Sequence, residues 1–292
     1  MKLLITGTTG RLGGVLVRHY TSRYDLLTPG RDRLDLSKPE SMTTALRDMD
    51  FDLLINCAGI TSPDVCEREP ELAARINAEA PAVMATECQR RGARMIQIST
   101  DYVFDGETED LLDETLITNP VNHYGRTKRD GETTVLRECP EALVARVSWL
   151  FGGSNGPSFP DQILNEVRQG KSLQAIGDKW SAPTSVHDIA SWLELLWQKM
   201  PSVSGPLNLC NSGVATWQTY GQQVVDFAVE LGLLAERLEV KGNRLDDFPS
   251  FIARRPRHTV MSNARLAELL GHPVRSWKEA LREWLQSLCA GA

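Results

Sequence analysis

The chain has 292 residues, of which 41% are hydrophobic and 24% are charged. This is enough to bury the core of one large α/β domain, or of a domain with a smaller companion. A net charge of −6 and a pI near 5.5 argue against a broad nucleic-acid surface or an anionic membrane as partner, because both favour clustered Lys and Arg.

The chain opens with a predicted strand, a glycine-rich turn and a helix. Residues 2–6 form a short apolar run typical of a buried strand, and after Gly13 an apolar pattern of helical period runs through Leu16, Val17 and Tyr20. Between them, Gly7 permits a tight turn, Gly10 allows the backbone to approach a pyrophosphate, and Gly13 allows the helix to pack on the strand. The helix N-terminus would offer N–H donors to phosphate. We therefore interpret this segment as a dinucleotide-binding turn rather than an ordinary one.

Apolar strand-like runs and helical stretches alternate through the first half of the chain. The strands are expected near 26–28, 53–58, 95–99 and 143–147, and the helices near 39–47, 70–91 and 124–138. This alternation predicts an α/β fold, a Rossmann-like doubly wound parallel sheet with helices on both faces. Ligands of such sheets bind outside the carboxyl ends of the strands.

After about Gly152 the alternation loosens and Gly, Pro and Ser become frequent. Helices are expected over 160–169, 186–198, 220–231, 263–270 and 277–288, with short extended segments at 173–176 and 206–210. We predict a dinucleotide-binding domain over 1–151, to which segments from about 173 to 200 return. Residues 152–292 would form mainly a smaller, interleaved substrate-binding lobe.

Tyr124 and Lys128 lie four residues apart in a predicted helix, 24 residues after Thr100. Positions i and i+4 share one helix face, so both side chains can point into one pocket. The ammonium would lower the pKa of the phenol from about 10 and make Tyr124 a proton donor near neutral pH. Such a pair is more often a half-buried Tyr beside a solvated Lys, but the glycine turn upstream favours the catalytic interpretation.

Arg31 follows the second predicted strand, where NAD-specific enzymes commonly place an acid. A guanidinium there can hold a 2′-phosphate instead, which predicts NADPH as cofactor with NADH as the alternative. A solvated turn charge is the other interpretation of Arg31.

Cysteine and histidine patterns point to neither disulfides nor metal. The six cysteines show no Cys-x-x-Cys spacing, and the five histidines form no ligand pattern. Since no apolar stretch reaches the length of a membrane span and a strand is expected at residue 2, we expect a cytoplasmic protein.

Several motifs resemble the extended short-chain dehydrogenase/reductase superfamily, and within it the dTDP-4-dehydrorhamnose reductases. They are Gly7-x-x-Gly10-x-x-Gly13, Asn56-Cys57-Ala58-Gly59, the segment 99–106, Tyr124-Gly125-Arg126-Thr127-Lys128, the segments 146–152 and 182–190, and Arg255-Pro256. The resemblance covers nearly the whole chain. It implies reduction of the 4-keto group of a nucleotide-activated deoxysugar, a small-molecule partner; we also allow for a homodimer.

The resemblance also implies residue roles. Tyr124 would protonate the substrate oxygen, Lys128 would lower the pKa of Tyr124 and hold the nicotinamide ribose, and Thr100 would hydrogen-bond the substrate. Cofactor contacts are expected from Gly7, Thr9, Gly10, Arg11, Leu12, Gly13, Arg31, Asp35, Leu36, Cys57, Ala58, Gly59 and Thr61, with Asp35 near the adenine. Substrate contacts are expected from Asp101, Val103, Trp149 and Lys179.

Departures from the family pattern lie on the substrate side. The run Asp178-Lys179-Trp180-Ser181-Ala182-Pro183-Thr184 lacks the usual Gln and Gly, and Ile60 and Cys66 replace an aromatic residue and a Lys. We expect Lys179 to face an anionic part of the ligand or to form a salt bridge that closes the pocket. Arg254, Arg255 and Arg257 form a second candidate phosphate cluster, or a solvated charge run.

Two other functions stay open from the sequence. One is an epimerase or dehydratase of the same superfamily, although Asp101-Tyr102 does not supply the acid pair that such dehydratases usually carry. The other is a non-catalytic regulatory subunit that keeps the fold and binds a nucleotide, because fold alone does not fix function.

Overall fold

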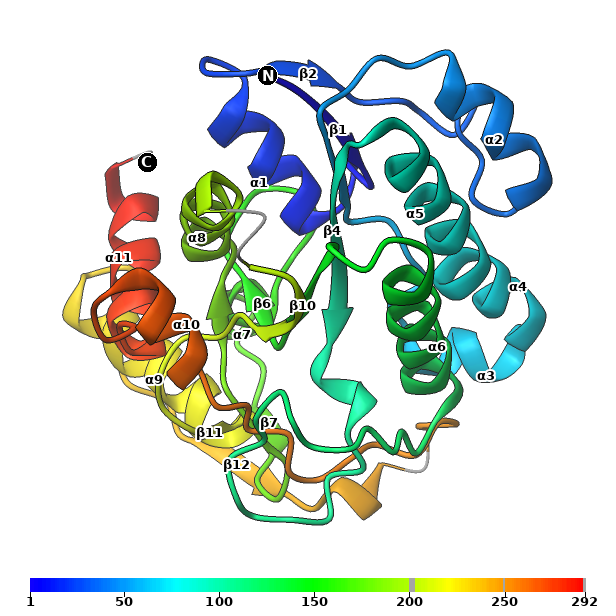
Figure 1. The fold of residues 1–292 in the computed structure, drawn as a ribbon. Helices are drawn as coiled ribbons and strands as arrows, with labels where there is room; N and C mark the ends of the chain where they lie inside the picture. The colour runs from blue at the N-terminus through cyan, green and yellow to red at the C-terminus, as the bar shows by residue number, and fades with distance from the viewer. Residues whose placement is uncertain (200–202, 249, 291–292) are drawn as a thin grey trace.

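A six-stranded parallel sheet forms the centre of the molecule (Figure 1). A computed structural model describes residues 1–199, 203–248 and 250–290. The strand order is β10-β5-β4-β3-β1-β2, and every neighbouring pair is parallel. The strands are β1 (Lys2–Thr6), β2 (Asp25–Leu27), β3 (Leu53–Asn56), β4 (Arg94–Thr100), β5 (Leu143–Val147) and β10 (Gly205–Asn208). The predicted Rossmann-like α/β fold is confirmed.

Helices cover both faces of this sheet. Leu3 and Ile5 of β1 pack into one core, and Leu4 between them packs into another, because successive strand side chains point to opposite faces. The first core includes α1 (Arg11–Tyr20) and α8 (Val186–Lys199); the second includes α2 (Pro39–Arg47), α5 (Ala80–Arg91) and α6 (His123–Glu138). The two sets of helices lie on opposite sides in Figure 1. Burial on both faces explains why these strands read as continuous apolar runs.

A third core, separate from the two that flank the sheet, builds the lobe. It contains Phe151, Leu164, Val224 and Leu281. Its elements are β6 (Leu150–Phe151), α7 (Phe159–Arg168), β7 (Leu173–Ile176), β11 (Ala215–Thr216), α9 (Trp217–Glu230), β12 (Val240–Asn243) and α11 (Trp277–Ala290). Strands β7 and β12 pair in parallel, β8 (Trp180–Ser181) pairs with β11, and β6 pairs with β9 (Thr184–Ser185).

The chain returns to the central sheet later than the sequence pattern indicated. Strand β7 pairs with β12 inside the lobe, and its Leu173 belongs to the lobe core. The return is carried by α8, by β10 and by α10 (Ala264–Leu270), whose Leu266 packs into the first sheet core. A four-residue apolar run predicts a strand but not the sheet that the strand joins. The limits of the two units, 1–151 and 152–292, remain a proposal.

The predicted helix over 70–91 is interrupted by a π-helical turn. It consists of α4 (Pro70–Ala74), the turn Arg75–Glu79 and α5. A short helix, α3 (Pro63–Arg68), precedes it and is capped by Ser62. The turn places Asn77 so that its amide accepts from the N–H of Ile60 (2.9 Å) and donates to the Ile60 carbonyl (3.0 Å) and to Thr127 Oγ1 (3.1 Å). Asn77 therefore fixes the loop after β3 against α6, and π-turns often occur at functional sites.

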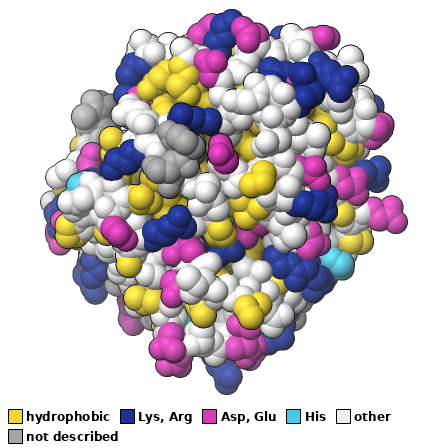
Figure 2. Space-filling view, viewed as in Figure 1, with side chains coloured by type: hydrophobic (Ala, Val, Ile, Leu, Met, Phe, Trp, Pro, Cys, Tyr) yellow, Lys and Arg dark blue, Asp and Glu magenta, His cyan; other side chains and the backbone are white. Residues whose placement is uncertain are grey.

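The surface carries both signs of charge. Figure 2 shows one face on which Lys and Arg side chains are interspersed with Asp and Glu, with small hydrophobic groups between them. Some ion pairs join distant parts of the chain: Arg23 contacts Glu194 of α8 (2.6 Å), and Arg275, just before α11, contacts Asp188 of α8 (2.6 Å). Among the described residues, no helix is long and apolar enough to cross a bilayer.

Candidate active site

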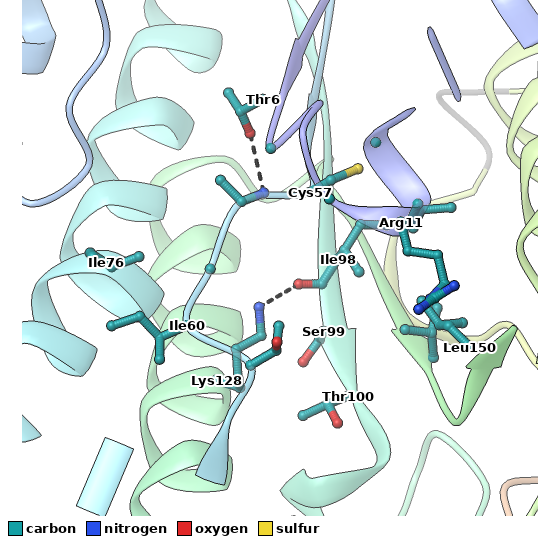
Figure 3. A pocket seen from close by; sticks show the side chains of 18 of the residues that line it. Thr6, Arg11, Cys57, Ile60, Ile76, Ile98, Ser99, Thr100, Lys128 and Leu150 are labelled. Carbon is teal, nitrogen blue, oxygen red and sulfur yellow. Dashed lines mark hydrogen bonds between the residues drawn. The ribbon is translucent and has the colours of Figure 1, made fainter. Parts of the chain in front are cut away.

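A cavity of about 730 Å³ lies at the carboxyl ends of β1, β3, β4 and β5 (Figure 3). This is the edge at which parallel α/β sheets bind ligands. Most of the predicted site residues line it: Gly7, Thr9, Gly10, Arg11, Leu12, Gly13, Arg31, Leu36, Cys57, Ala58, Gly59, Thr61, Thr100, Asp101, Tyr124, Lys128 and Trp149. Asp35, Val103 and Lys179 are not among the lining residues.

The glycine turn forms a cradle that side chains would fill. Gly7 has φ +65°, and a Cβ on it would stand 2.6 Å from the backbone nitrogen of Ala58. A Cβ on Gly13 would stand 2.4 Å from the Gly7 carbonyl oxygen. Gly10 is the N-cap of α1, and neither a capping side chain nor an acidic residue occupies the first turn of that helix. Gly10 and the first helical residues line the cavity, and the first turn has no side-chain acceptor for its N–H groups, which suits a diphosphate.

A row of buried side-chain hydrogen bonds crosses the sheet below the cavity. Thr6 Oγ1 donates to Asn56 Oδ1 (2.6 Å), and Asn56 Nδ2 donates to Gln97 Oε1 (2.8 Å). Gln97 Nε2 continues to the Ile98 carbonyl (2.9 Å), which also accepts from Lys128 Nζ (2.6 Å). Figure 3 shows Lys128 reaching this carbonyl from α6. The network links strand β1 to Lys128, and the partners of Lys128 were not apparent from the sequence.

Thr100, Tyr124 and Lys128 come together as predicted. Thr100 ends β4, while Tyr124 and Lys128 lie on the face of α6 that meets the cavity. Asn122 caps this helix by accepting from the N–H of Gly125 (2.8 Å). All three side chains are buried, and Lys128 is only 6% exposed. The cavity therefore combines a phenol, an ammonium and a hydroxyl beside the glycine cradle.

The pKa of Tyr124 differs from the sequence-based expectation. Burial raises the pKa of the Tyr124 phenol above its ordinary value, although hydrogen bonding with Thr100 opposes the rise. Burial also lowers the pKa of Lys128 to about 8, with the Glu132 carboxylate opposing the fall. The expected lowering failed because the sequence could not show how completely the phenol is removed from water. A raised pKa keeps Tyr124 protonated at neutral pH, which is the state that a proton donor needs.

Asp101 lies at the floor of the cavity with its carboxylate fully engaged. Thr259 Oγ1 donates to it at 2.6 Å, Thr100 Oγ1 at 3.1 Å and Ser181 Oγ at 3.2 Å. Burial raises its pKa, and the charge of Lys179 is the first opposing influence. Ser181 and Thr259 are functional neighbours that the sequence did not reveal, because hydroxyl residues 80 and 158 positions away carry no local pattern.

Trp149 forms part of the cavity wall in an unusual backbone conformation. Its φ is +41°, the one positive value for a non-glycine residue within 1–199, 203–248 and 250–290. Its ring stacks on Trp217 with centroids 3.9 Å apart and planes 18° apart. Val103, by contrast, is buried in a hydrophobic cluster with Phe104, Ala182 and Met261, so its side chain faces away from the cavity.

Lys179 does not form, with any described residue, the salt bridge that was one of its two predicted roles, and it is not among the residues that line the cavity. Its side chain is buried, and Nζ donates to the carbonyl of Pro256 at 2.6 Å. In the described part of the chain it forms no ion pair within 4.0 Å. Backbone pairing explains the burial: the N–H of Trp180, the next residue, donates to the Arg257 carbonyl (2.7 Å), and the Trp180 carbonyl accepts from the N–H of Thr259 (2.9 Å), so this segment packs against the C-terminal segment.

Arg31, in the loop that follows β2, lines the cavity. The Arg31 side chain is 82% exposed, and its Nε lies 4.0 Å from Asp35 Oδ1. The same Asp35 oxygen accepts from the N–H (3.0 Å) and hydroxyl (2.7 Å) of Ser37, so Asp35 is turned to its own loop. Leu34 lines the cavity beside Leu36, a contact that the sequence analysis did not include.

The arginines of the second candidate phosphate cluster are each paired with a carboxylate. Arg254 contacts Glu107 (2.7 Å), Arg255 contacts Asp64 (2.7 Å), and Arg257 contacts Asp178 and Asp246. Among the residues that the structure describes, no cluster of His, Cys, Asp and Glu could hold a metal ion.

Comparisons with known proteins agree with this site. Residues 1–289 match the family model of the RmlD substrate binding domain. A probable dTDP-4,6-dihydroxy-2-methyloxan-3-one 4-ketoreductase of Streptomyces antibioticus is 34% identical over 99% of this chain and 96% of its own. A dTDP-4-dehydrorhamnose reductase of Clostridium acetobutylicum superposes with a TM-score of 0.89 at 30% identity, over 99% of this chain and 100% of the other. The Bacillus anthracis enzyme of the same name, solved with NADP, gives a TM-score of 0.89 at 26% identity over 98% and 99% of the two chains.

Proposed function

The chain belongs to the RmlD substrate binding domain family, and from this premise we propose that it reduces the 4-keto group of a dTDP-activated deoxysugar with NADPH. The observation that carries the proposal is the convergence of Thr100, Tyr124 and Lys128 in one cavity with the glycine cradle. Reduction of a ketone needs a hydride, a proton and stabilisation of the developing alkoxide. Bound NADPH supplies the hydride; the chain must supply the other two.

In this proposal Tyr124 protonates the substrate oxygen. Its phenol is held neutral by burial, and an alkoxide that develops on the substrate is basic enough to take its proton. The Thr100 hydroxyl, which donates to Asp101 at 3.1 Å in this structure, would turn its one proton to the same substrate oxygen when the sugar binds. Lys128 adds positive charge beside it and orients the nicotinamide ribose. A Lys128 pKa of about 8 leaves this side chain mostly protonated at neutral pH.

The cofactor fits the residues present. The cradle of Gly7, Gly10 and Gly13 and the N-terminus of α1 suit the diphosphate. Arg31, exposed at the end of β2, suits a 2′-phosphate, which favours NADPH over NADH. Further contacts are assigned to Thr9, Arg11, Leu12, Leu36, Cys57, Ala58, Gly59 and Thr61, all of which line the cavity. Asp35 does not line it, so its expected place near the adenine would require its carboxylate to turn away from Ser37.

We assign the sugar ring to the side of the cavity formed by Asp101 and Trp149. The named relatives act on different dTDP-activated sugars, according to their descriptions, but share the dTDP group and the reduction. Of the departures from the family pattern, Ile60 lines the cavity, Cys66 packs with Tyr124 behind it, and Lys179 lies near the rings of Tyr102 and Trp149. The proposal therefore commits to a dTDP-activated 4-keto deoxysugar as the class of substrate. It includes a cytoplasmic location and allows a homodimer, which light scattering on the purified protein would test.

Turnover measurements test the function directly. The purified protein is incubated with NADPH or NADH and a panel of dTDP-linked and UDP-linked 4-keto sugars, and nicotinamide oxidation is followed. We expect turnover with dTDP-linked substrates and a preference for NADPH, with NMR of the product showing a new hydroxyl at C4. Absence of turnover with every keto sugar, together with stabilisation of a partner enzyme, would instead identify a regulatory subunit. Return of unreduced sugar with inverted configuration would identify an epimerase.

A further inference from the structure

Lys179 is a fully buried ammonium that the proposed chemistry does not use. It immediately precedes β8, its side chain is 2% exposed, and it lies outside the residues that line the cavity. Burial lowers its pKa to about 8, Asp101 opposes the fall, and Arg255 adds to it. Burial of a cation without a paired carboxylate disfavours folding, so its contacts need an explanation other than stability.

Those contacts join the segments that form the substrate side of the cavity. Nζ donates to the Pro256 carbonyl at 2.6 Å. It also lies 4.9 Å from the ring centroid of Tyr102 and 5.9 Å from that of Trp149. Both aromatic residues line the cavity. One side chain therefore connects the loop after β4, the loop after β5 and the C-terminal segment around 256.

Both rings bear on the geometry of the proposed reaction. Tyr102 packs edge-on against Tyr124, with centroids 5.6 Å apart and planes at 64°. The backbone of Trp149 has a φ of +41°. A bulky residue keeps this conformation only when its surroundings restrain it. Stacking on Trp217 restrains one part of this ring, and the N–H of Thr184 binds the Trp149 carbonyl at 3.2 Å. The Lys179 cation supplies a further attraction to the ring.

We propose that Lys179 is a positioning residue for the substrate: its ammonium holds the rings of Tyr102 and Trp149 and so sets the wall against which the sugar binds. The inference rests on the proposed function, since it assigns the sugar to this wall. Lys179 itself does not contact the sugar. Its loss should therefore weaken binding of the sugar nucleotide while leaving hydride and proton transfer, and the NADPH site, nearly intact.

The variant Lys179→Met tests this proposal, because it separates an effect on the stability of the protein from an effect on binding of the sugar nucleotide. Methionine has similar length and no charge, so the melting temperature should be equal to or higher than that of the wild type. The KM for the dTDP-sugar should rise about 3- to 30-fold, the range for losing a desolvated cation–π contact, with kcat and the KM for NADPH little changed. Lys171→Met, which alters an exposed lysine near β7, is the matched control and should change none of these.

Lys179→Gln refines the test, because Gln keeps an N–H donor but carries no charge. We expect it to share the defect of Lys179→Met; wild-type KM in this variant would overturn the role of the cation. A lower melting temperature of Lys179→Met with losses in kcat and in both KM values would show a general structural role instead. Calorimetry gives the same comparison without turnover: it measures the Kd of dTDP-rhamnose for the wild type and for each Lys179 variant in the presence of NADP⁺. A wild-type protein that binds the sugar nucleotide but does not reduce it would thus refute the proposed function and still test Lys179.

Discussion

Two buried lysines flank the pair Tyr102 and Tyr124, and their local surroundings are similar. Nζ of Lys128 donates to the Ile98 carbonyl and Nζ of Lys179 to the Pro256 carbonyl, both at 2.6 Å. Burial lowers the pKa of each to about 8. Lys128, however, lines the cavity from α6, whereas Lys179 lies behind the aromatic wall. Burial and a perturbed pKa therefore do not by themselves identify a catalytic group; access to the reacting atoms does.

The largest expected difference between the two lysines is in kcat. Lys128→Met removes the charge beside the developing alkoxide and the proposed ribose contact, so kcat should fall by more than the roughly 10²–10⁴-fold typical of one general acid. NADPH affinity should fall as well, as measured by fluorescence titration. Equal kinetic profiles for Lys128→Met and Lys179→Met would abolish the distinction drawn between them.

Tyr124→Phe should cause the next largest loss. It removes one hydroxyl and keeps the ring that packs against Tyr102, so kcat should fall by about 10²–10⁴-fold with NADPH affinity nearly unchanged. Tyr24→Phe is a suitable control, because the Tyr24 hydroxyl donates to Glu194 of α8 and neither residue lines the cavity. Full activity of Tyr124→Phe would contradict the assignment of the proton donor.

A third variant contrasts the buried ammonium groups with an exposed guanidinium. Arg31→Ala should weaken NADPH binding by roughly 1–3 kcal/mol, the range for a charged hydrogen bond, and leave NADH binding almost unchanged. Arg33, which is exposed and does not line the cavity, provides the control Arg33→Ala. Equal losses for both cofactors would remove Arg31 from the phosphate site.

The smallest expected effect is on stability, and here the two lysines should behave alike. Both pKa values lie near 8, below the ordinary 10.5. Between pH 8 and pH 10.5 each lysine is mostly neutral in the folded protein and still protonated in the unfolded chain. The free energy of unfolding of the wild type therefore rises with pH across this range. Either Met variant should then exceed the wild type by roughly 1–2 kcal/mol near pH 7 and lose that advantage toward pH 10. Urea denaturation at both pH values measures it, and an advantage that grows with pH would contradict the assignment.

The features that could be predicted from the sequence are those whose interacting residues lie close together along the chain. The glycine cradle and the i, i+4 pair of Tyr124 and Lys128 were predictable, because each is encoded within a few residues. The donors to Asp101 from Ser181 and Thr259 were not, because only the folded chain brings them together. The predicted lowering of the Tyr124 pKa and the predicted salt bridge of Lys179 do not occur for one reason: both depend on how much water the completed fold excludes.

The sixth strand of the sheet also has a consequence for synthesis on the ribosome. Strand β5 ends at Val147 and its partner β10 begins at Gly205, 58 residues later, with the whole of α8 between them. At about 5–20 residues per second, a nascent chain would wait roughly 3–12 s with the β5 edge unpaired and the face beneath α8 uncovered. Translation speed over 148–208, and any chaperone that shields this edge, should therefore influence the yield of native protein more than they would for a sheet completed in chain order.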